Sequence, residues 1–371
     1  MRWVLAALAV LVLCAPAAAA TPEVDARAYL VENAQTGDVL LARHAHDRLP
    51  IASLTKLMTA IGATSMLRPS ATVVVDPEAA GVTGSTIRLR AGEHILVRDL
   101  LAGALIQSAN DAAVALGEQM EKQAGVAISE LMNTWAAGIG LKDTHFVRPD
   151  GLDVPGHYSS AYDVTKLAIV AMRVPLIRRL VRRESATIAG GRTLHTWNDL
   201  LGEFPGVFGV KTGHTSSAGW SQVAAVRGNG VTLYVTVLGS PSRSTRNGDL
   251  EELIAWGLSR YALVALAPPD RVYGRVPVNW DREAVPVVAA RPVRRAVRIG
   301  RPLIERVVLP SRLELPVHGG QVVGQLRIYD GKRVIGRAPL VAAEDRDEPG
   351  VLDRSAWYAG RAIDHIGGWF T

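Results

Sequence analysis

The spacing of apolar residues changes at one point in the chain, and this change restricts the fold more than any other feature of the sequence. Up to Ala267, several long stretches repeat apolar residues at helical spacing, and short β-rich runs separated by glycine accompany them. The following Pro268-Pro269-Asp270 is typical of a domain boundary. Beyond it, helical spacing is lost until the last segment of the chain. We therefore expect two domains, which also suits a length of 371 residues.

The first region is predicted to be an α+β domain in which helices pack on an antiparallel sheet. Residues 28–32 and 39–43 are predicted to form a hairpin, because Gln35-Thr36-Gly37 supplies a turn between them. Helical spacing occurs in residues 57–66, 96–107, 111–124, 127–138, 160–173 and 250–264. Further β-rich runs occupy residues 209–213, 220–226 and 232–238.

The second region is predicted to be a small all-β domain, either a sandwich or a barrel. Turns are expected at Gly319-Gly320 and Asp330-Gly331, because glycine there interrupts runs of β-branched residues. The strand-like runs are residues 272–278, 285–289, 293–299, 306–309, 313–317, 322–329 and 333–338.

Residues 1–20 have the features of a secretory signal peptide. Arg2 is their one charge, residues 4–14 form an apolar core, and Ala18-Ala19-Ala20 offers a cleavage site of small residues. Cys14, the one cysteine of the chain, lies inside this segment, so the mature chain would lack thiol and disulfide chemistry. Cys14 is not expected to be a lipid-modified cysteine, because Leu13 before it is bulky where lipoprotein cleavage sites have a small residue. We therefore expect an exported protein.

The formal net charge is +6, and loss of Arg2 with the signal would leave +5. Such a charge favours anionic surfaces such as lipid headgroups or a cell-wall polymer. A merely soluble basic protein would carry the same charge, so charge alone leaves both readings open.

Residues 349–371 are predicted to form an amphipathic helix. Their apolar residues recur three or four positions apart, and Trp357, Tyr358 and Trp369 add aromatic side chains. A helix of this kind can lie in a membrane interface. The alternative is a helix that docks on its own β-domain.

Three short motifs occur once each, in the order Ser53-Leu54-Thr55-Lys56, Ser108-Ala109-Asn110 and Lys211-Thr212-Gly213. Together they indicate a serine acyl-transfer site. The chain has 35 Arg but only 6 Lys, and two of these lysines lie in the motifs. A guanidinium stays protonated in a protein, whereas a desolvated ammonium can become a neutral base. A lysine at position 56 therefore fits a catalytic role that arginine could not take.

Ser53 and Lys56 are three residues apart, so they share a face if they begin a helix. The Ser53 hydroxyl is a weak nucleophile and needs a neighbouring base, which a neutral Lys56 can supply. The alternative for Ser53 is a helix N-cap, a common position for serine.

The other two motifs supply a hydroxyl, an amide and a cation. Ser108 can relay a proton between Lys56 and a leaving amine, and the amide of Asn110 can hold both Lys56 and the substrate backbone. Lys211 and Thr212 suit a substrate carboxylate, and Gly213 leaves room where another backbone comes close. The alternatives are an N-cap at Asn110 and an ordinary strand end at residues 211–213.

In this order and at these separations, the motifs resemble those of the serine penicillin-recognising enzymes. Two small departures are Ile51, where the family usually has Pro or another small residue, and Ala109 in place of the commoner Gly. The sequence is further similar to the low-molecular-mass D-alanyl-D-alanine carboxypeptidases. The similarity covers their nucleophile segment, their later catalytic motifs, their accessory domain and their amphipathic anchor. The matching residues are 48–60, 150–153, 155–159, 209–215, 218–219, 315–317, 320–324, 339–342 and 360–366.

The resemblance implies a β-lactamase/transpeptidase-like catalytic domain at residues 21–266, an accessory domain at 267–348 and an anchor helix at 349–371. It implies that Ser53 attacks the carbonyl between two D-alanines of a peptidoglycan stem peptide. The backbone N–H groups of Ser53 and His214 would form the oxyanion hole. β-Lactam antibiotics would acylate the same serine and leave slowly.

By the same resemblance, the catalytic residues are Ser53, Lys56 and Ser108, and the substrate-binding residues are Asn110, Lys211, Thr212, Gly213 and His214. The enzyme would use no metal or other cofactor. It would work outside the cytoplasm, in peripheral contact with the cytoplasmic membrane through its C-terminal helix, and nucleic acid is not an expected partner.

Three other functions share part of this pattern. A D,D-endopeptidase would use the same chemistry on a longer substrate. A β-lactamase needs an efficient deacylating base, and no clear Glu-x-x-Asn follows the second motif. A non-catalytic cell-wall sensor would be favoured by the loss of a motif residue, and every motif residue is present.

Overall fold

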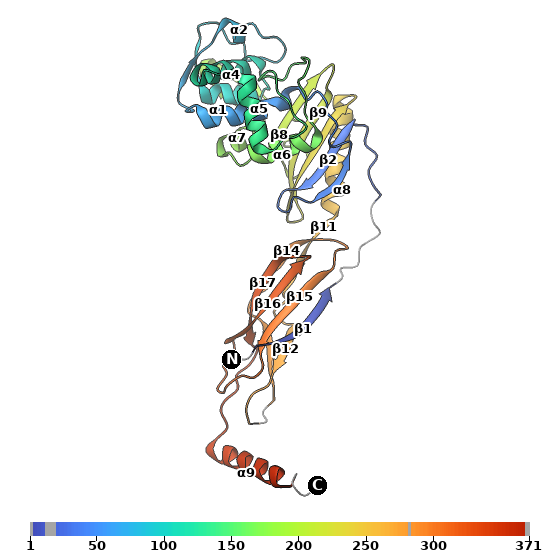
Figure 1. Ribbon diagram of the computed structural model, residues 1–371, viewed down its shortest axis with the longest axis vertical. Coiled ribbons are helices and arrows are strands. Elements are labelled where there is room, and N and C mark those ends of the chain that lie inside the picture. Colours follow the sequence, from blue (N-terminus) through green and yellow to red (C-terminus); the bar gives the residue numbers. More distant parts are fainter. Residues whose placement is uncertain (1–2, 12–19, 281–282, 368–371) are drawn as a thin grey trace. The chain divides into compact units, whose positions relative to one another are not determined.

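The computed structural model describes residues 3–11, 20–280 and 283–367. It consists of two compact units, one formed by Ala19–Arg260 and the other by Met1–Ala18 with Tyr261–Thr371 (Figure 1). The expected boundary between residues 266 and 267 lies a few residues after this division, and the expected domain limits stay predictions.

The Ala19–Arg260 unit is built on a five-stranded antiparallel sheet. The strand order is β3-β2-β10-β9-β8, and the strands are β2 (Ala28–Asn33), β3 (Val39–Arg43), β8 (Val207–Thr215), β9 (Gly219–Gly228) and β10 (Val231–Ser240). The predicted hairpin is confirmed, since β2 and β3 pair directly. The N-terminal and C-terminal parts of this unit therefore meet in one sheet, where β2 pairs with β10.

Helices cover both faces of this sheet. On one face, α6 (Ala161–Ala171) places the hydroxyl of Thr165 2.6 Å from that of Thr236 on β10. On the other face, α8 (Arg243–Ser259) brings Gly257 against the side chains of Leu233 and Val31. The expected α+β class is confirmed by this arrangement.

The remaining helices pack beside the sheet around α1 (Lys56–Met66), whose apolar residues join the main core. Its neighbours are α3 (Val97–Leu105), α4 (Asn110–Ala124), α5 (Ile128–Ile139) and α7 (Pro175–Leu180). The short elements of this unit are η1 (Ala52–Thr55), α2 (Pro77–Ala80), η2 (Ala189–Gly191), β4 (Thr72–Val74), β5 (His94–Leu96), β6 (Ser185–Ile188) and β7 (Arg192–His195).

The helix expected at residues 250–264 is partly wrong. It begins earlier, because Ser242 caps it by accepting a hydrogen bond from the backbone N–H of Thr245 at 3.0 Å, and its first turns are too polar to show helical spacing. It also ends earlier, at Ser259, and Tyr261–Ala265 forms strand β11 instead. Alternating inward and outward side chains in that segment fit a strand better than a helix.

The second unit is all-β apart from its last helix, as expected. Its larger sheet has the order β1-β15-β16-β17-β13-β12, and a separate pair joins β11 to β14 (Arg294–Arg298). The larger sheet consists of β1 (Trp3–Leu11), β12 (Val272–Val276), β13 (Val285–Ala289), β15 (Leu303–Pro310), β16 (Val322–Asp330) and β17 (Arg333–Ala342). The strand expected at residues 313–317 is wrong: Leu313 and Val317 form only isolated bridges, and Pro316 between them cannot donate to a ladder.

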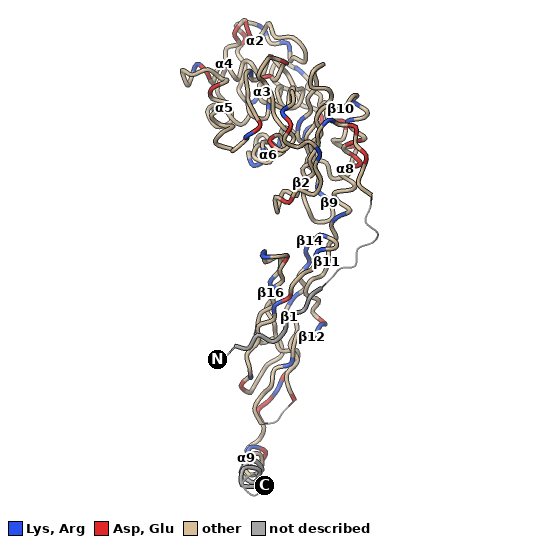
Figure 2. The backbone as a smooth tube through the Cα atoms, turned by 45° about the vertical axis from the view of Figure 1, so that its right-hand side comes forward, with Lys and Arg blue, Asp and Glu red and all other residues tan. Residues whose placement is uncertain are grey.

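Both ends of the chain belong to this unit. Residues 3–11, expected within the signal peptide, form β1 and pair with β15; of the expected cleavage site, Ala18 and Ala19 lie outside the described residues. Val351–Gly367 forms α9, as expected, and residues 368–371 also lie outside the described part. Among the described residues, no helix is long and apolar enough to cross a membrane. Lysine and arginine residues occur along the backbone of both units (Figure 2).

Candidate active site

Ser53 lies in the short turn η1, directly before α1. Its Oγ is 2.6 Å from Nζ of Lys56, the first residue of that helix. The residue before η1 is Ile51, and Ser53 makes no capping hydrogen bond, so the N-cap alternative for Ser53 is wrong. The three-residue spacing therefore brings the hydroxyl and the amine together, as expected from the sequence.

Lys56 is fully buried and has three oxygen neighbours. Besides Ser53, its Nζ lies 2.7 Å from Oδ1 of Asn110 and 2.6 Å from the backbone carbonyl of Asp150. A neutral amine has two N–H groups and one lone pair. The amide and carbonyl oxygens can only accept, so they take the two N–H groups, and the lone pair is left for the Ser53 hydroxyl.

Burial also favours the neutral form of this lysine. The pKa of Lys56 is lowered to about 7, chiefly by desolvation; the carboxylates of Asp150 and Asp111 oppose this shift, and nearby Arg148 adds to it. Asp150 is itself buried and held by the guanidinium of Arg148. The loop can approach this closely because the next residue is Gly151: a Cβ there would lie 2.0 Å from the backbone oxygen of Ala52.

The second motif crosses the gap between α3 and α4. Ser108 adopts a left-handed conformation with φ of 63°, which places it between the helices. Asn110 is the first residue of α4, and its Nδ2 donates to the carbonyl of Thr83 at 2.8 Å. The N-cap position belongs to Ala109, so the N-cap alternative for Asn110 is also wrong.

The third motif lies on strand β8 at the edge of the five-stranded sheet. Nζ of Lys211 donates to Oγ of Ser108 at 2.8 Å and to the backbone carbonyl of Thr212 at 2.9 Å. A Cβ at Gly213 would lie 2.7 Å from the backbone oxygen of Ile51, and 3.2 Å from the backbone nitrogen of Ser53. Glycine therefore lets β8 pass against the turn that carries Ser53.

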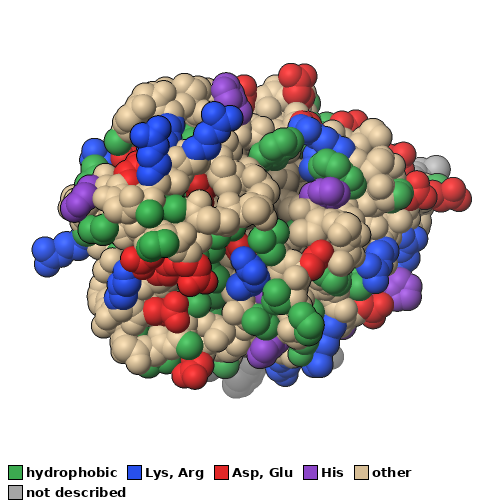
Figure 3. Space-filling view, turned by 90° about the horizontal axis from the view of Figure 1, so that it is seen from above, with side chains coloured by type: hydrophobic (Ala, Val, Ile, Leu, Met, Phe, Trp, Pro, Cys, Tyr) green, Lys and Arg blue, Asp and Glu red, His purple; other side chains and the backbone are tan. Residues whose placement is uncertain are grey.

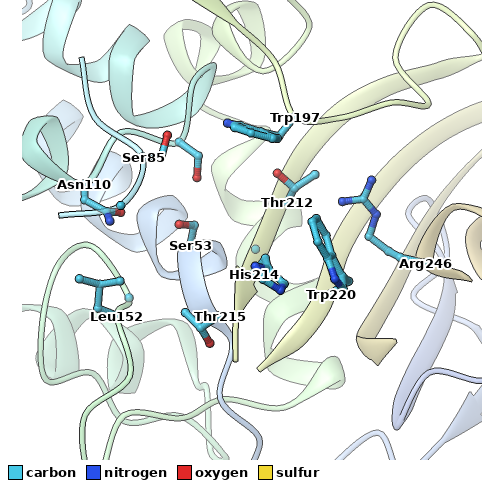
Figure 4. A pocket seen from close by; sticks show the side chains of 14 residues that line it. Ser53, Ser85, Asn110, Leu152, Trp197, Thr212, His214, Thr215, Trp220 and Arg246 are labelled. Atoms are coloured by element: carbon cyan, nitrogen blue, oxygen red, sulfur yellow. The ribbon is translucent and has the colours of Figure 1, made fainter. Parts of the chain in front are cut away.

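These motifs meet at a cleft of about 290 Å³ (Figure 4). Lys56 and Lys211 lie beneath its surface, since neither is among the described residues that line it. The cleft is lined by Ser53, Gly84, Ser85, Ser108, Asn110, Gly151, Leu152, Trp197, Thr212, Gly213, His214, Thr215, Trp220 and Arg246. On the face shown in Figure 3, acidic and basic side chains both occur.

Arg246 is the one Lys or Arg among the described residues that line the cleft. It lies on α8, and its Nη2 donates to Asp199 at 2.8 Å and to Asn247 at 2.6 Å. Burial lowers its pKa to about 10, so it stays protonated at neutral pH. In contrast, burial lowers the pKa of Lys211 well below its usual value, and the positive charges that Arg246 carries and Lys56 can carry lower it as well.

Sequence reasoning missed Arg246 because arginine is so common in this chain. One signal was present: α8 starts with Arg243 and has no acidic residue in its first turn, whereas helix N-termini favour negative charge. The aromatic walls of the cleft were missed as well. Trp220 stacks on His214 with ring centroids 4.0 Å apart, and both are held by the pairing of β8 with β9.

Comparison with known proteins follows the same division of the chain. Residues 15–242 match the family described as D-alanyl-D-alanine carboxypeptidase, and residues 261–348 match the C-terminal domain of penicillin-binding protein 5. A D-alanyl-D-alanine carboxypeptidase from Salmonella typhimurium, DacD, is 30% identical over 91% of this chain and 90% of its own.

Two solved structures are also similar. Penicillin-binding protein 5 from Haemophilus influenzae has a TM-score of 0.64 and 28% identity, covering 89% of this chain and 99% of its own. The Streptomyces K15 DD-transpeptidase has a TM-score of 0.60 and 30% identity, covering 64% of this chain and 98% of its own.

Proposed function

The chain belongs to the D-alanyl-D-alanine carboxypeptidase family of serine peptidases, and from that premise we propose that Ser53 is the residue acylated during catalysis. The enzyme acts on peptidoglycan stem peptides and has the fold of the penicillin-binding proteins. The 2.6 Å contact between Ser53 and a buried lysine is the observation that carries the proposal.

In the acylation step, neutral Lys56 takes the proton from Ser53 as Oγ attacks the carbonyl carbon between the two D-alanines. Negative charge develops on the carbonyl oxygen, which we place between the backbone N–H groups of Ser53 and His214. The C–N bond then breaks, and Lys56 passes the proton it took from Ser53 through Ser108 to the amine of the leaving D-alanine, so that Lys56 is neutral again. The product is an ester between Ser53 and the shortened peptide.

In the second step, water hydrolyses this ester and restores the Ser53 hydroxyl. Lys56 is the nearest group able to accept a proton from that water, because it remains beside Oγ. Asn110 holds Lys56 through its Oδ1 and can meet the substrate backbone at the wall of the cleft. β-Lactam antibiotics would form the corresponding acyl-enzyme on Ser53, and this acyl-enzyme would be hydrolysed slowly.

The terminal carboxylate of the substrate needs a cation, and two candidates are available. The sequence favoured Lys211, together with Thr212 and Gly213. Both candidates are buried, but Arg246 lines the cleft and stays ionised, so we propose that Arg246 and the Thr212 hydroxyl contact the carboxylate. Lys211 would then hold Ser108 and Thr212 from behind through its two hydrogen bonds.

We also propose that the protein is exported and touches the outer face of the cytoplasmic membrane. The apolar Val351 and Leu352 of α9 are 80% and 86% exposed, which suits insertion into a lipid interface. The docking alternative has support too, because Trp280 of the β-unit packs edge-to-face on Trp357 and Tyr358, each at 5.2 Å.

The decisive experiment has two readouts on purified protein. Incubation with a pentapeptide ending in D-Ala-D-Ala should release free D-alanine. Mass spectrometry after labelling with a fluorescent penicillin should place the adduct on Ser53. An adduct on another residue, or none in folded protein, would overturn the assignment of Ser53.

A further inference from the structure

We propose that Trp197 closes the leaving-group end of the cleft and so restricts the enzyme to a single terminal residue. This inference rests on the proposed function, because it assumes acylation at Ser53 and a carboxylate at Arg246. It concerns the choice between a carboxypeptidase and an endopeptidase, which share all of the catalytic motifs.

The cleft has two ends with Ser53 between them (Figure 4). Leu152 and Thr215 lie at one end, and Trp197, Thr212 and Arg246 lie at the other. A substrate whose carboxylate meets Arg246 has its leaving residue at the second end. The rest of the stem peptide must therefore leave the cleft past Leu152.

Trp197 is unusual because a large apolar side chain is 43% exposed at the mouth of a cleft. An indole in this position contributes little to the core, and two contacts hold it there. Its Nε1 donates to the backbone carbonyl of Gln107 at 3.1 Å, directly before Ser108. The Arg243 guanidinium lies 5.2 Å from the ring centroid on one face.

The support for Trp197 is connected to the carboxylate site. Arg243 and Arg246 both bind Asp199, and the Nε of Arg243 lies 2.8 Å from its carboxylate. This bridging lowers the pKa of Asp199 to about 2, so the carboxylate stays ionised and the network persists at neutral pH. One network thus fixes both the cation that would bind the terminal carboxylate and the indole beside it.

Two consequences follow for a longer leaving group. A peptide that continues beyond the second D-alanine has an amide where the carboxylate would be, so it loses the ion pair with Arg246. Its next residue must also enter the space held by the indole. The first effect depends on charge and the second on size, so different substrates can separate them.

The test compares three acylated peptides that end in D-Ala-D-Ala, in D-Ala-D-Ala-amide, and in D-Ala-D-Ala-Gly. For each, kcat/KM is measured with the wild type, Trp197→Gly and Trp197→Phe. We expect Trp197→Gly to raise the ratio of the Gly-extended to the amidated peptide by about tenfold or more, the lower range of steric discrimination in a pocket. Trp197→Phe should give a smaller rise, because the phenyl ring fills part of the same space.

Leu152→Ala is the matched control at the opposite end of the cleft, and it should change all three peptides by a similar factor. An unchanged ratio in both Trp197 variants, with penicillin acylation intact, would overturn the role of Trp197 and leave the proposed function standing. Failure of the folded wild type to release D-alanine from the first peptide would instead overturn the proposed function. If Trp197→Gly fails to fold, the ratio for Trp197→Phe decides the question.

Discussion

At the scale of single residues, the site depends on how two buried lysines differ. Lys56 meets two obligate acceptors and one hydroxyl, whereas Lys211 meets one hydroxyl and one carbonyl. Only Lys56 has a lone pair directed by its surroundings towards the nucleophile. Its neighbours thus define its chemical role more closely than its burial does, because both lysines are buried.

Replacing Lys56 by arginine tests whether this residue acts as a base. Lys56→Arg keeps a positive charge but cannot deprotonate. The rate of acylation by penicillin should fall by roughly 10²-fold or more, the lower range of general-base catalysis. Near-normal acylation in a folded variant would refute the role of base.

The pH dependence of acylation should report the same lysine. Lys56 must be neutral to act as a base, and its pKa is lowered to about 7. The rate of acylation should therefore rise with pH up to about this value and level off above it. Asp150→Asn removes the carboxylate that raises this pKa and leaves the opposing Arg148, so the rise should move to lower pH. A rise that stays in place, or moves to higher pH, would contradict this electrostatic account.

Arg246 and Lys211 can be separated as carboxylate ligands by their substrates. Arg246→Gln should slow cleavage of free-carboxylate peptides by about 10-fold to 10²-fold, the value of a charge-assisted hydrogen bond, and should affect amidated analogues much less. Lys211→Ala, which removes the contact to Ser108, should slow both peptides. Steady-state kinetics on the two peptides measures both effects. The reverse pattern would identify Lys211 as the residue that binds the carboxylate.

At the scale of secondary-structure elements, one row of side chains in the β-unit contradicts the usual pairing rules. Arg306 on β15 is the register partner of Arg327 on β16, which is in turn the partner of Arg337 on β17. Three arginines therefore lie side by side on one face, and within the described residues none of them forms an ion pair. Like charges directly opposite each other destabilise a sheet.

Relieving this repulsion should stabilise the β-unit. Arg327→Thr removes both close pairs and introduces a β-branched residue, so we expect a gain of about 0.5–1 kcal/mol in the free energy of unfolding. Calorimetry of the full chain should show a higher melting temperature. Arg275→Thr on β12 is the control, because its register partner is Pro286. Equal gains in both variants would mean that threonine, and not the lost repulsion, is responsible.

The sequence predicted elements well where one periodicity ran through a whole segment. The helix at 57–66 and the hairpin at 28–43 were of this kind, since each pattern is local. The start of α8 was missed because a polar first turn hides it, and residues 313–317 failed because Pro316 interrupts the ladder. The motifs identified Ser53 and Lys56, but Arg246 and Trp197 reach the cleft only through long-range packing, which no local pattern records.

At the scale of the whole molecule, the motif residues and the last helix belong to different units. Every motif residue of the proposed chemistry lies within Ala19–Arg260, so the chemistry should not need the β-unit. The other unit carries α9, whose first turns combine exposed apolar residues with an aromatic contact to Trp280. These two features predict different roles for the last segment, namely lipid contact and docking.

Deleting residues 349–371 distinguishes the two roles. If α9 anchors the protein in lipid, the truncated form should no longer co-sediment with anionic vesicles, and peptide cleavage in solution should not change. If α9 serves only to dock on the β-unit, the full-length protein should bind vesicles weakly and the truncated form should melt at a lower temperature. A second variant, Leu352→Asp, changes a residue that is 86% exposed, so it should weaken vesicle binding without lowering the melting temperature. Equal co-sedimentation of all three proteins would exclude the anchor, because neither the helix nor its exposed apolar surface would then contribute to binding.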